Sequence, residues 1–125
     1  MKNKNKNIWL ERPEEHNYPA AQDYLELIYS PEVAHKLVSC LDGSDIVKKK
    51  AKDILRASEL QLLSKKNSHV QSNKKKVKNG KKLSPILLVR TGEKVIIADG
   101  WHRVNYIYFY ESEDHQIPCK IVSAS

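Results

Sequence analysis

The strand–turn–helix junction at residues 95–105 is the feature that most restricts the fold of this chain. Three β-forming residues at 95–97 lead through Ala98 to Asp99 and Gly100, and an amphipathic segment with helical spacing follows. Gly100 permits a turn with positive φ or a close approach by a ligand. The first amides of the following helix lack intrahelical partners and attract anions. We therefore predict a strand that turns directly into a helix, with an anion site at the turn.

His102 and Arg103 occupy the first turn of this predicted helix. A helix N-terminus favours acidic side chains, so two basic residues there cost some helix stability and point to a negative ligand. The planar fork of arginine suits phosphate, and histidine can contact a phosphate or transfer a proton near neutral pH. The alternatives are an ordinary salt bridge for Arg103 and a hydrogen bond to a core carbonyl for His102. We favour a nucleotide phosphate as the ligand of both.

The other residues of the turn have more than one interpretation. Asp99 is suited to binding a metal or a ribose, to acid–base chemistry, or to an Asx-turn that shapes the strand end. Trp101 is suited to stacking on a base, to covering a pocket, or to filling the core. We take Gly100 and Trp101, with His102 and Arg103, as candidate nucleotide-binding residues. Asp99 and His102 are the candidate acid–base groups.

The junction also resembles a known superfamily. ParB/sulfiredoxin-like proteins have an Asp-Gly-x-His-Arg element between a strand and a helix, which is similar to residues 99–103 here. Residues 83–90 resemble the Pro-Ile-x-Val-Arg strand of that fold, and residues 117–122 fit its final strand. The resemblance spans residues 60–122 and implies a small mixed sheet. It also implies that the turn holds the phosphates of ATP or CTP, together with Mg²⁺.

Differences from each branch of the superfamily narrow the implied activity. Sulfiredoxin needs a cysteine nucleophile where this chain has Trp101, so sulfinic acid reduction is not expected. Chromosome-partitioning ParB proteins have a Gly-Glu-Arg-Arg element and a helix-turn-helix domain, neither of which is seen here. The free-serine-kinase branch has Asp-Gly-His-His-Arg, which differs from residues 99–103 only at Trp101. The resemblance thus implies a small phosphotransferase or nucleotide hydrolase, with Asn67 and His69 near the nucleotide.

Composition indicates one globular domain in a reducing compartment. The 125 residues are 40% hydrophobic and 30% charged, and no apolar run approaches the roughly 20 residues that cross a bilayer. We expect a disordered basic tail at residues 1–7 and a single domain at residues 8–125. Cys40 and Cys119 lack metal-ligand spacing. We therefore expect two buried free thiols, no metal site formed by cysteine and histidine, no membrane association and a cytoplasmic location.

Hydrophobic periodicity predicts an α+β fold in which a helical N-terminal half packs on a small mixed sheet. Apolar residues recur at helical spacing as far as residue 55, and continuous β-forming runs appear after residue 84. We expect Ser30 to cap the second helix, and Ser44 or Asp45 to cap the third. The predicted helices cover residues 19–29, 31–42, 70–79 and 101–110. A further predicted helix, third in chain order, includes residues 47–55. The predicted strands cover residues 60–63, 85–89, 95–98 and 117–122, with polar loops at 64–69 and 111–115.

Positive charge is concentrated in the middle of the chain. Residues 46–90 hold 14 Lys and Arg against 2 Asp and Glu, a net charge of +12. Such a segment attracts nucleic acid or nucleotide phosphates, but it is also what a solvated lysine surface looks like. Lysine dominates it and aromatic residues are absent from it, which weakens the nucleic-acid interpretation. The alternative to a nucleotide enzyme is thus a non-enzymatic module that binds nucleic acid or protein through residues 46–90.

Overall fold

The computed structural model describes residues 7–124 and has the predicted α+β fold. The predicted tail at residues 1–7 lies outside the described residues, except for Asn7. The helices are α1 (Asn17–Leu25), α2 (Pro31–Asp42), α3 (Ala51–Ser58), α4 (Ser68–Lys78) and α5 (Trp101–Tyr110). The strands are β1 (Val47–Lys50), β2 (Ile86–Thr91), β3 (Lys94–Asp99) and β4 (Gln116–Ser123). Within the described residues, none of the helices has both the length and the apolar character needed to cross a bilayer.

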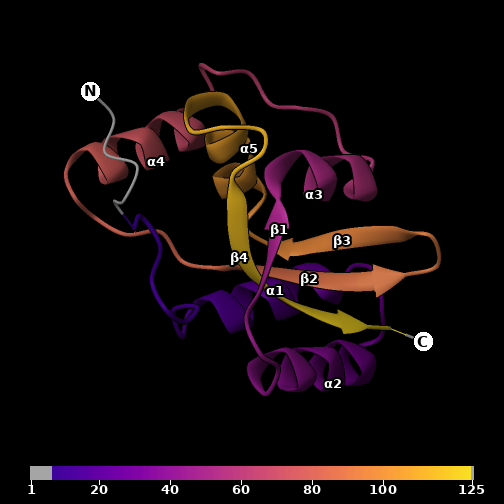
Figure 1. Ribbon diagram of the computed structural model, residues 1–125. Coiled ribbons are helices and arrows are strands. Elements are labelled where there is room, and N and C mark those ends of the chain that lie inside the picture. The colour runs from indigo at the N-terminus through magenta and orange to yellow at the C-terminus, as the bar shows by residue number, and fades with distance from the viewer. Residues whose placement is uncertain (1–6, 125) are drawn as a thin grey trace.

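The four strands form one mixed sheet in the order β1-β4-β2-β3 (Figure 1). The outer pairs, β1 with β4 and β2 with β3, are antiparallel, whereas the central strands β4 and β2 run parallel. The β2–β3 hairpin turns at Gly92, which has a φ of 57°. The turn between β3 and α5 therefore lies at the end of an edge strand.

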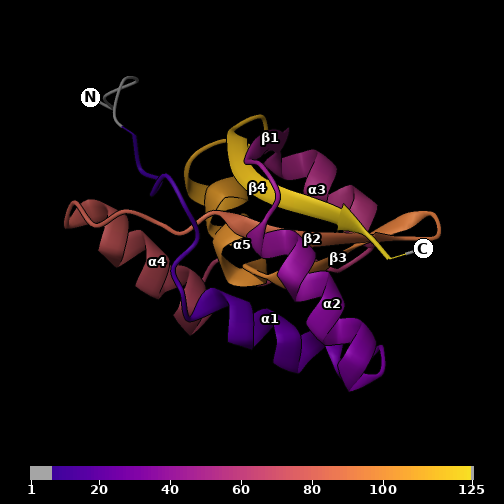
Figure 2. The ribbon, with the colours of Figure 1, turned by 90° about the horizontal axis from the view of Figure 1, so that it is seen from below.

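Side chains of β2 alternate between two hydrophobic cores, because successive residues of a strand point to opposite faces of the sheet. Ile86 and Leu88 pack in the cluster that includes residues of α3, α4 and α5. Leu87 and Val89 pack with residues of α1 and α2. The sheet is thus the middle of three layers, with the α1–α2 pair on one face and the other three helices on the opposite face (Figures 1 and 2).

The predicted third helix is wrong over its first turn. Val47–Lys50 is a strand, β1, which pairs with β4 from Val47 opposite Cys119 to Lys50 opposite Gln116. The helix α3 starts only at Ala51, and neither Ser44 nor Asp45 caps it. The Ser44 hydroxyl instead donates to the Leu41 carbonyl, 2.9 Å away. The helical half of the chain therefore contributes one edge strand to the sheet.

Two further predictions are corrected in the segment between α3 and β2. Residues 60–63 are not a strand, because the Leu63 amide donates to the Asn105 side chain on α5 at 2.9 Å rather than to another strand. The predicted loop at residues 64–69 ends two residues early. α4 begins at Ser68, since the Asn67 side chain accepts hydrogen bonds from the amides of His69 and Val70.

The two cysteines differ in their environment. Cys119 is fully buried in β4, as predicted, and burial raises the pKa of its thiol to about 11. Cys40 is exposed on α2, so the prediction that it is buried is wrong. The core face of α2 consists instead of Ala34, Leu37, Val38 and Leu41. Both thiols are free.

Candidate anion-binding site

The turn between β3 and α5 has the geometry that the sequence predicts. Gly100 has a φ of 116°, a conformation that residues with a side chain rarely adopt. A Cβ atom added to Gly100 would lie 2.4 Å from Cδ1 of Ile86 and 3.0 Å from a guanidinium nitrogen of Arg103. Packing against Ile86 therefore explains this glycine without a ligand.

Arg103, in the first turn of α5, is held at the turn by an ion pair with Asp99, the last residue of β3. Its Nη2 donates to Oδ2 of Asp99 at 2.8 Å, and the exposed fractions of the two side chains are only 17% and 19%. The Arg103 Nε is buried and has no hydrogen-bond partner within the described residues. Because the Arg103 side chain also lines the cavity described below, its remaining N–H groups can hold a second anion there.

His102 lies beside a second imidazole, from α4. The ring centroids of His102 and His69 are 4.4 Å apart, with an angle of 36° between the ring planes. Burial, followed by the electrostatic interactions with His69 and Arg103, lowers the pKa of His102 below its ordinary value. The imidazole of His102 is therefore neutral near pH 7, and a bound anion would favour its protonation.

Side chains from α4 and from the turn enclose a small polar cavity of about 200 Å³. Its lining consists of His69, Ser72, Asn73 and Lys76 from α4, and Asp99, Gly100, His102 and Arg103 from the turn. Packing of α4 on α5 through Val70 and Val77 brings these two groups together. Ser72, Asn73 and Lys76 were missed in the sequence analysis, although their spacing from His69 places all four on one helical face.

Two predicted binding residues lie outside this cavity. Trp101 packs against the core formed with α3, α4 and α5, and its buried Nε1 has no hydrogen-bond partner within the described residues. Asn67 caps α4, with its side-chain oxygen 2.9 Å from the His69 amide nitrogen. Trp101 thus has the core-filling position, and Asn67 orients the helix that carries His69.

The donor set of the cavity fits an anion better than a bare metal ion. Within residues 7–124, no three His, Cys, Asp or Glu side chains gather in a metal-binding cluster. Asp99 is the one carboxylate among the described residues of the lining, and Arg103 already neutralises it. Magnesium prefers several oxygen ligands and is commonly bound through substrate phosphates. Mg²⁺ would therefore have to enter this cavity as part of a metal–phosphate complex.

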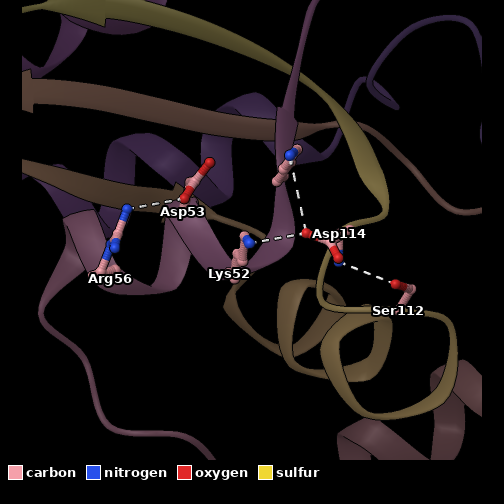
Figure 3. Close-up of polar contacts among 6 residues, drawn as sticks. Lys52, Asp53, Arg56, Ser112 and Asp114 are labelled. Atoms are coloured by element: carbon pink, nitrogen blue, oxygen red, sulfur yellow. Dashed lines mark hydrogen bonds and ion pairs between the residues drawn. The ribbon is translucent and has the colours of Figure 1, made fainter.

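The lysines of the basic segment, residues 46–90, lie on two parts of the surface, one formed by β1 and α3 and the other around α4. On β1 and α3, Lys52 lies 3.0 Å and Lys50 lies 4.0 Å from the same carboxylate oxygen of Asp114, in the acidic loop before β4 (Figure 3). This ion pairing raises the pKa of Lys52 and lowers that of Asp114. These side chains are about half exposed, so each pair contributes little to stability. Part of the +12 segment is thus balanced locally by acidic side chains.

Comparison of the chain with protein-family models, with curated proteins and with solved structures found no match.

Proposed function

We propose that this protein binds the phosphates of a nucleotide, ATP or CTP, in the cavity between α4 and the β3–α5 turn. The observation that carries the proposal is that α4 adds His69, Ser72 and Lys76 to the side of the turn already occupied by Arg103. These residues were not part of the motif that first suggested a phosphate ligand. The resemblance of residues 99–103 to the ParB/sulfiredoxin-like superfamily favours a nucleotide over inorganic phosphate.

The side chains have complementary chemical roles in this proposal. Arg103 offers planar, charge-assisted hydrogen bonds, while Lys76 supplies a compact positive charge. The Ser72 hydroxyl can donate a hydrogen bond to phosphate. The first backbone amides of α5 point toward the N-terminal end of that helix, where the turn lies. A complete nucleotide pocket usually has about 300–1,000 Å³, whereas this cavity has about 200 Å³. The phosphates would therefore enter the cavity and the base would lie outside it.

A phosphotransferase or nucleotide hydrolase remains our second hypothesis, and the lowered pKa of His102 is the observation that favours it. Burial keeps the imidazole neutral in the free site, so that it can accept a proton from an attacking hydroxyl, and a bound phosphate would stabilise the imidazolium that forms. Asp99 is less suited to that role, because its carboxylate is paired with Arg103. In this hypothesis His102→Asn abolishes release of ADP from ATP and leaves binding of ATP within about tenfold. Equal turnover by His102→Asn and wild type would refute it.

Titration calorimetry with ATP, CTP, ADP and tripolyphosphate, each with and without Mg²⁺, tests phosphate binding. We expect Arg103→Ala and Lys76→Gln each to weaken binding by about tenfold to a hundredfold. Lys75→Gln is the matched control, because Lys75 is exposed on the same helix and does not line the cavity. Absence of binding by the wild type, or an equal loss in Lys75→Gln, would contradict the proposal.

Asp99→Asn separates a positioning role from a catalytic one. The substitution removes a negative charge from the cavity while it retains a side-chain oxygen that can accept from Arg103. If Asp99 only holds Arg103, we expect tighter binding of tripolyphosphate and unchanged turnover per bound nucleotide. A loss of turnover with retained binding would instead assign the chemistry to Asp99.

A further inference from the structure

Aromatic rings of α5 lie beside a lysine of α4 and a lysine of the loop that precedes it. The Nζ of Lys74 is 4.6 Å from the ring centroid of Tyr110, and the Nζ of Lys65 is 5.8 Å from that of Phe109. Gln71 of α4 donates to the Tyr110 hydroxyl at 2.9 Å. Residues 46–90 contain no Phe, Tyr or Trp. The fold therefore supplies to the basic segment the rings that its own sequence lacks.

The segment that contains α4 is positively charged and contains no acidic residue. Residues 60–92 include eight lysines and one arginine and no aspartate or glutamate, a net charge of +9. Within the described residues, no ion pair joins a lysine of α4 to a carboxylate, unlike Lys50 and Lys52 on the other basic surface. This positive charge is therefore available to an external polyanion.

The faces of α4 that point away from the core carry side chains, mostly lysines, that can donate hydrogen bonds to a ligand. Val70, Asn73 and Val77 are buried, and Lys76 lines the cavity described above. Lys74 reaches the Tyr110 ring on another side, and Lys75 and Lys78 are exposed. The 11 residues of α4 span about 16 Å. A helix of this length can lie beside a few consecutive phosphates of a single strand.

We propose that the surface formed by α4, Lys65, Phe109 and Tyr110 binds single-stranded nucleic acid. The lysines of α4 contact the phosphates, and the bases stack on the two rings in place of the lysine ammonium groups. Stacking requires unpaired bases, so a single strand is favoured over a duplex. Lysine gives point charges without the bidentate geometry that reads base edges, so little sequence preference is expected. This binding goes beyond the phosphate cavity and does not depend on it.

Fluorescence anisotropy with labelled oligo(dT) and oligo(U) that lack terminal phosphates tests the proposal. We expect binding at low salt that weakens as salt increases, with a slope of log affinity against log salt near −0.7 per phosphate contact. Lys74→Gln/Lys75→Gln should reduce the magnitude of that slope by about 1.4. The matched control is Lys48→Gln/Lys49→Gln, which removes the same charge from exposed positions of β1 and should leave the slope near that of the wild type.

Phe109→Leu tests the stacking part, because it keeps an apolar side chain of similar size and removes the ring. Loss of one stacked base should weaken binding by about fivefold to 150-fold. Arg103→Ala should leave oligonucleotide binding unchanged, so failure of the nucleotide proposal and failure of this one are distinguishable. The proposal would be overturned if the protein did not bind at low salt, or if the two double variants had equal effects. It would also be overturned if Phe109→Leu bound the oligonucleotide as the wild type does and polyglutamate displaced the oligonucleotide as effectively as a nucleic acid competitor.

Discussion

Substitution of Gly100 by alanine should destabilise the protein through two separate effects. The first is the backbone, because a residue with a side chain at a φ of 116° costs about 1–3 kcal/mol. The second is the contact with Ile86, whose Cδ1 would lie 2.4 Å from the new methyl group. Overpacking of this kind costs about 1–3 kcal/mol. We therefore expect Gly100→Ala to lower the free energy of unfolding by about 2–6 kcal/mol.

Gly80→Ala provides the matched control for the backbone effect. Gly80 also has a positive φ, of 81°, but a Cβ atom there would meet nothing within 4 Å. The difference between the two variants thus measures the contacts of the new methyl group, of which the one with Ile86 is the closest and the one with Arg103 the next. Adding Ile86→Val to Gly100→Ala removes Cδ1, the closest atom. The double variant should be destabilised by less than the sum of the two single changes, because the clash is shared by the two sites.

Urea denaturation followed by tryptophan fluorescence and circular dichroism measures all four free energies, provided that the transitions stay two-state. We expect Gly100→Ala to be less stable than Gly80→Ala by about 1–3 kcal/mol. Equal destabilisation of these two variants would refute the contact with Ile86 as the reason for glycine at the turn. Additive effects of Gly100→Ala and Ile86→Val would refute it as well.

One thiol, that of Cys40, should react with a disulfide reagent in the native protein, and Cys119 should react only in urea, since its pKa is raised to about 11 by burial. The pKa of His102 is lowered by folding, so the unfolded chain binds more protons and stability should fall as pH drops below about 6.5; urea midpoints for His102→Asn should vary less over this range. Asn105→Ala should cost about 2–3 kcal/mol and speed hydrogen exchange at Leu63, because the buried amide of Asn105 accepts from that backbone N–H at 2.9 Å.

The junction at residues 95–105 was predictable because its determinants are local. Successive β-forming residues favour β3, Gly100 permits the positive φ, and the following apolar spacing favours α5. The strand at Val47–Lys50 was not predictable in this way. Its lysines have low strand propensity, and Val47 also fits the helical spacing that continues into α3. Its strand conformation comes from pairing with β4, whose residues lie more than 60 positions later in the chain.

The composition of the cavity shows the same distinction between local and distant determinants. The motif at residues 99–103 indicates an anion site, but it does not indicate which segment closes it. The helical spacing of His69, Ser72 and Lys76 is visible in the sequence, yet so is a lysine-rich face on the other side of the same helix. Only the docking of α4 on α5 determines which of these faces meets the turn.

The ion pair between Asp99 and Arg103 accounts for both the stability of the unliganded site and its affinity for anions in our proposal. A guanidinium that is only 17% exposed would be costly without a counter-ion, and Asp99 supplies one from the preceding strand. The same carboxylate repels an incoming phosphate, so its charge weakens the affinity that Arg103 and Lys76 provide. Removal of that charge therefore has opposite effects on folding and on anion binding. If Asp99 acted in catalysis instead, the main effect of removing its charge would be a loss of turnover.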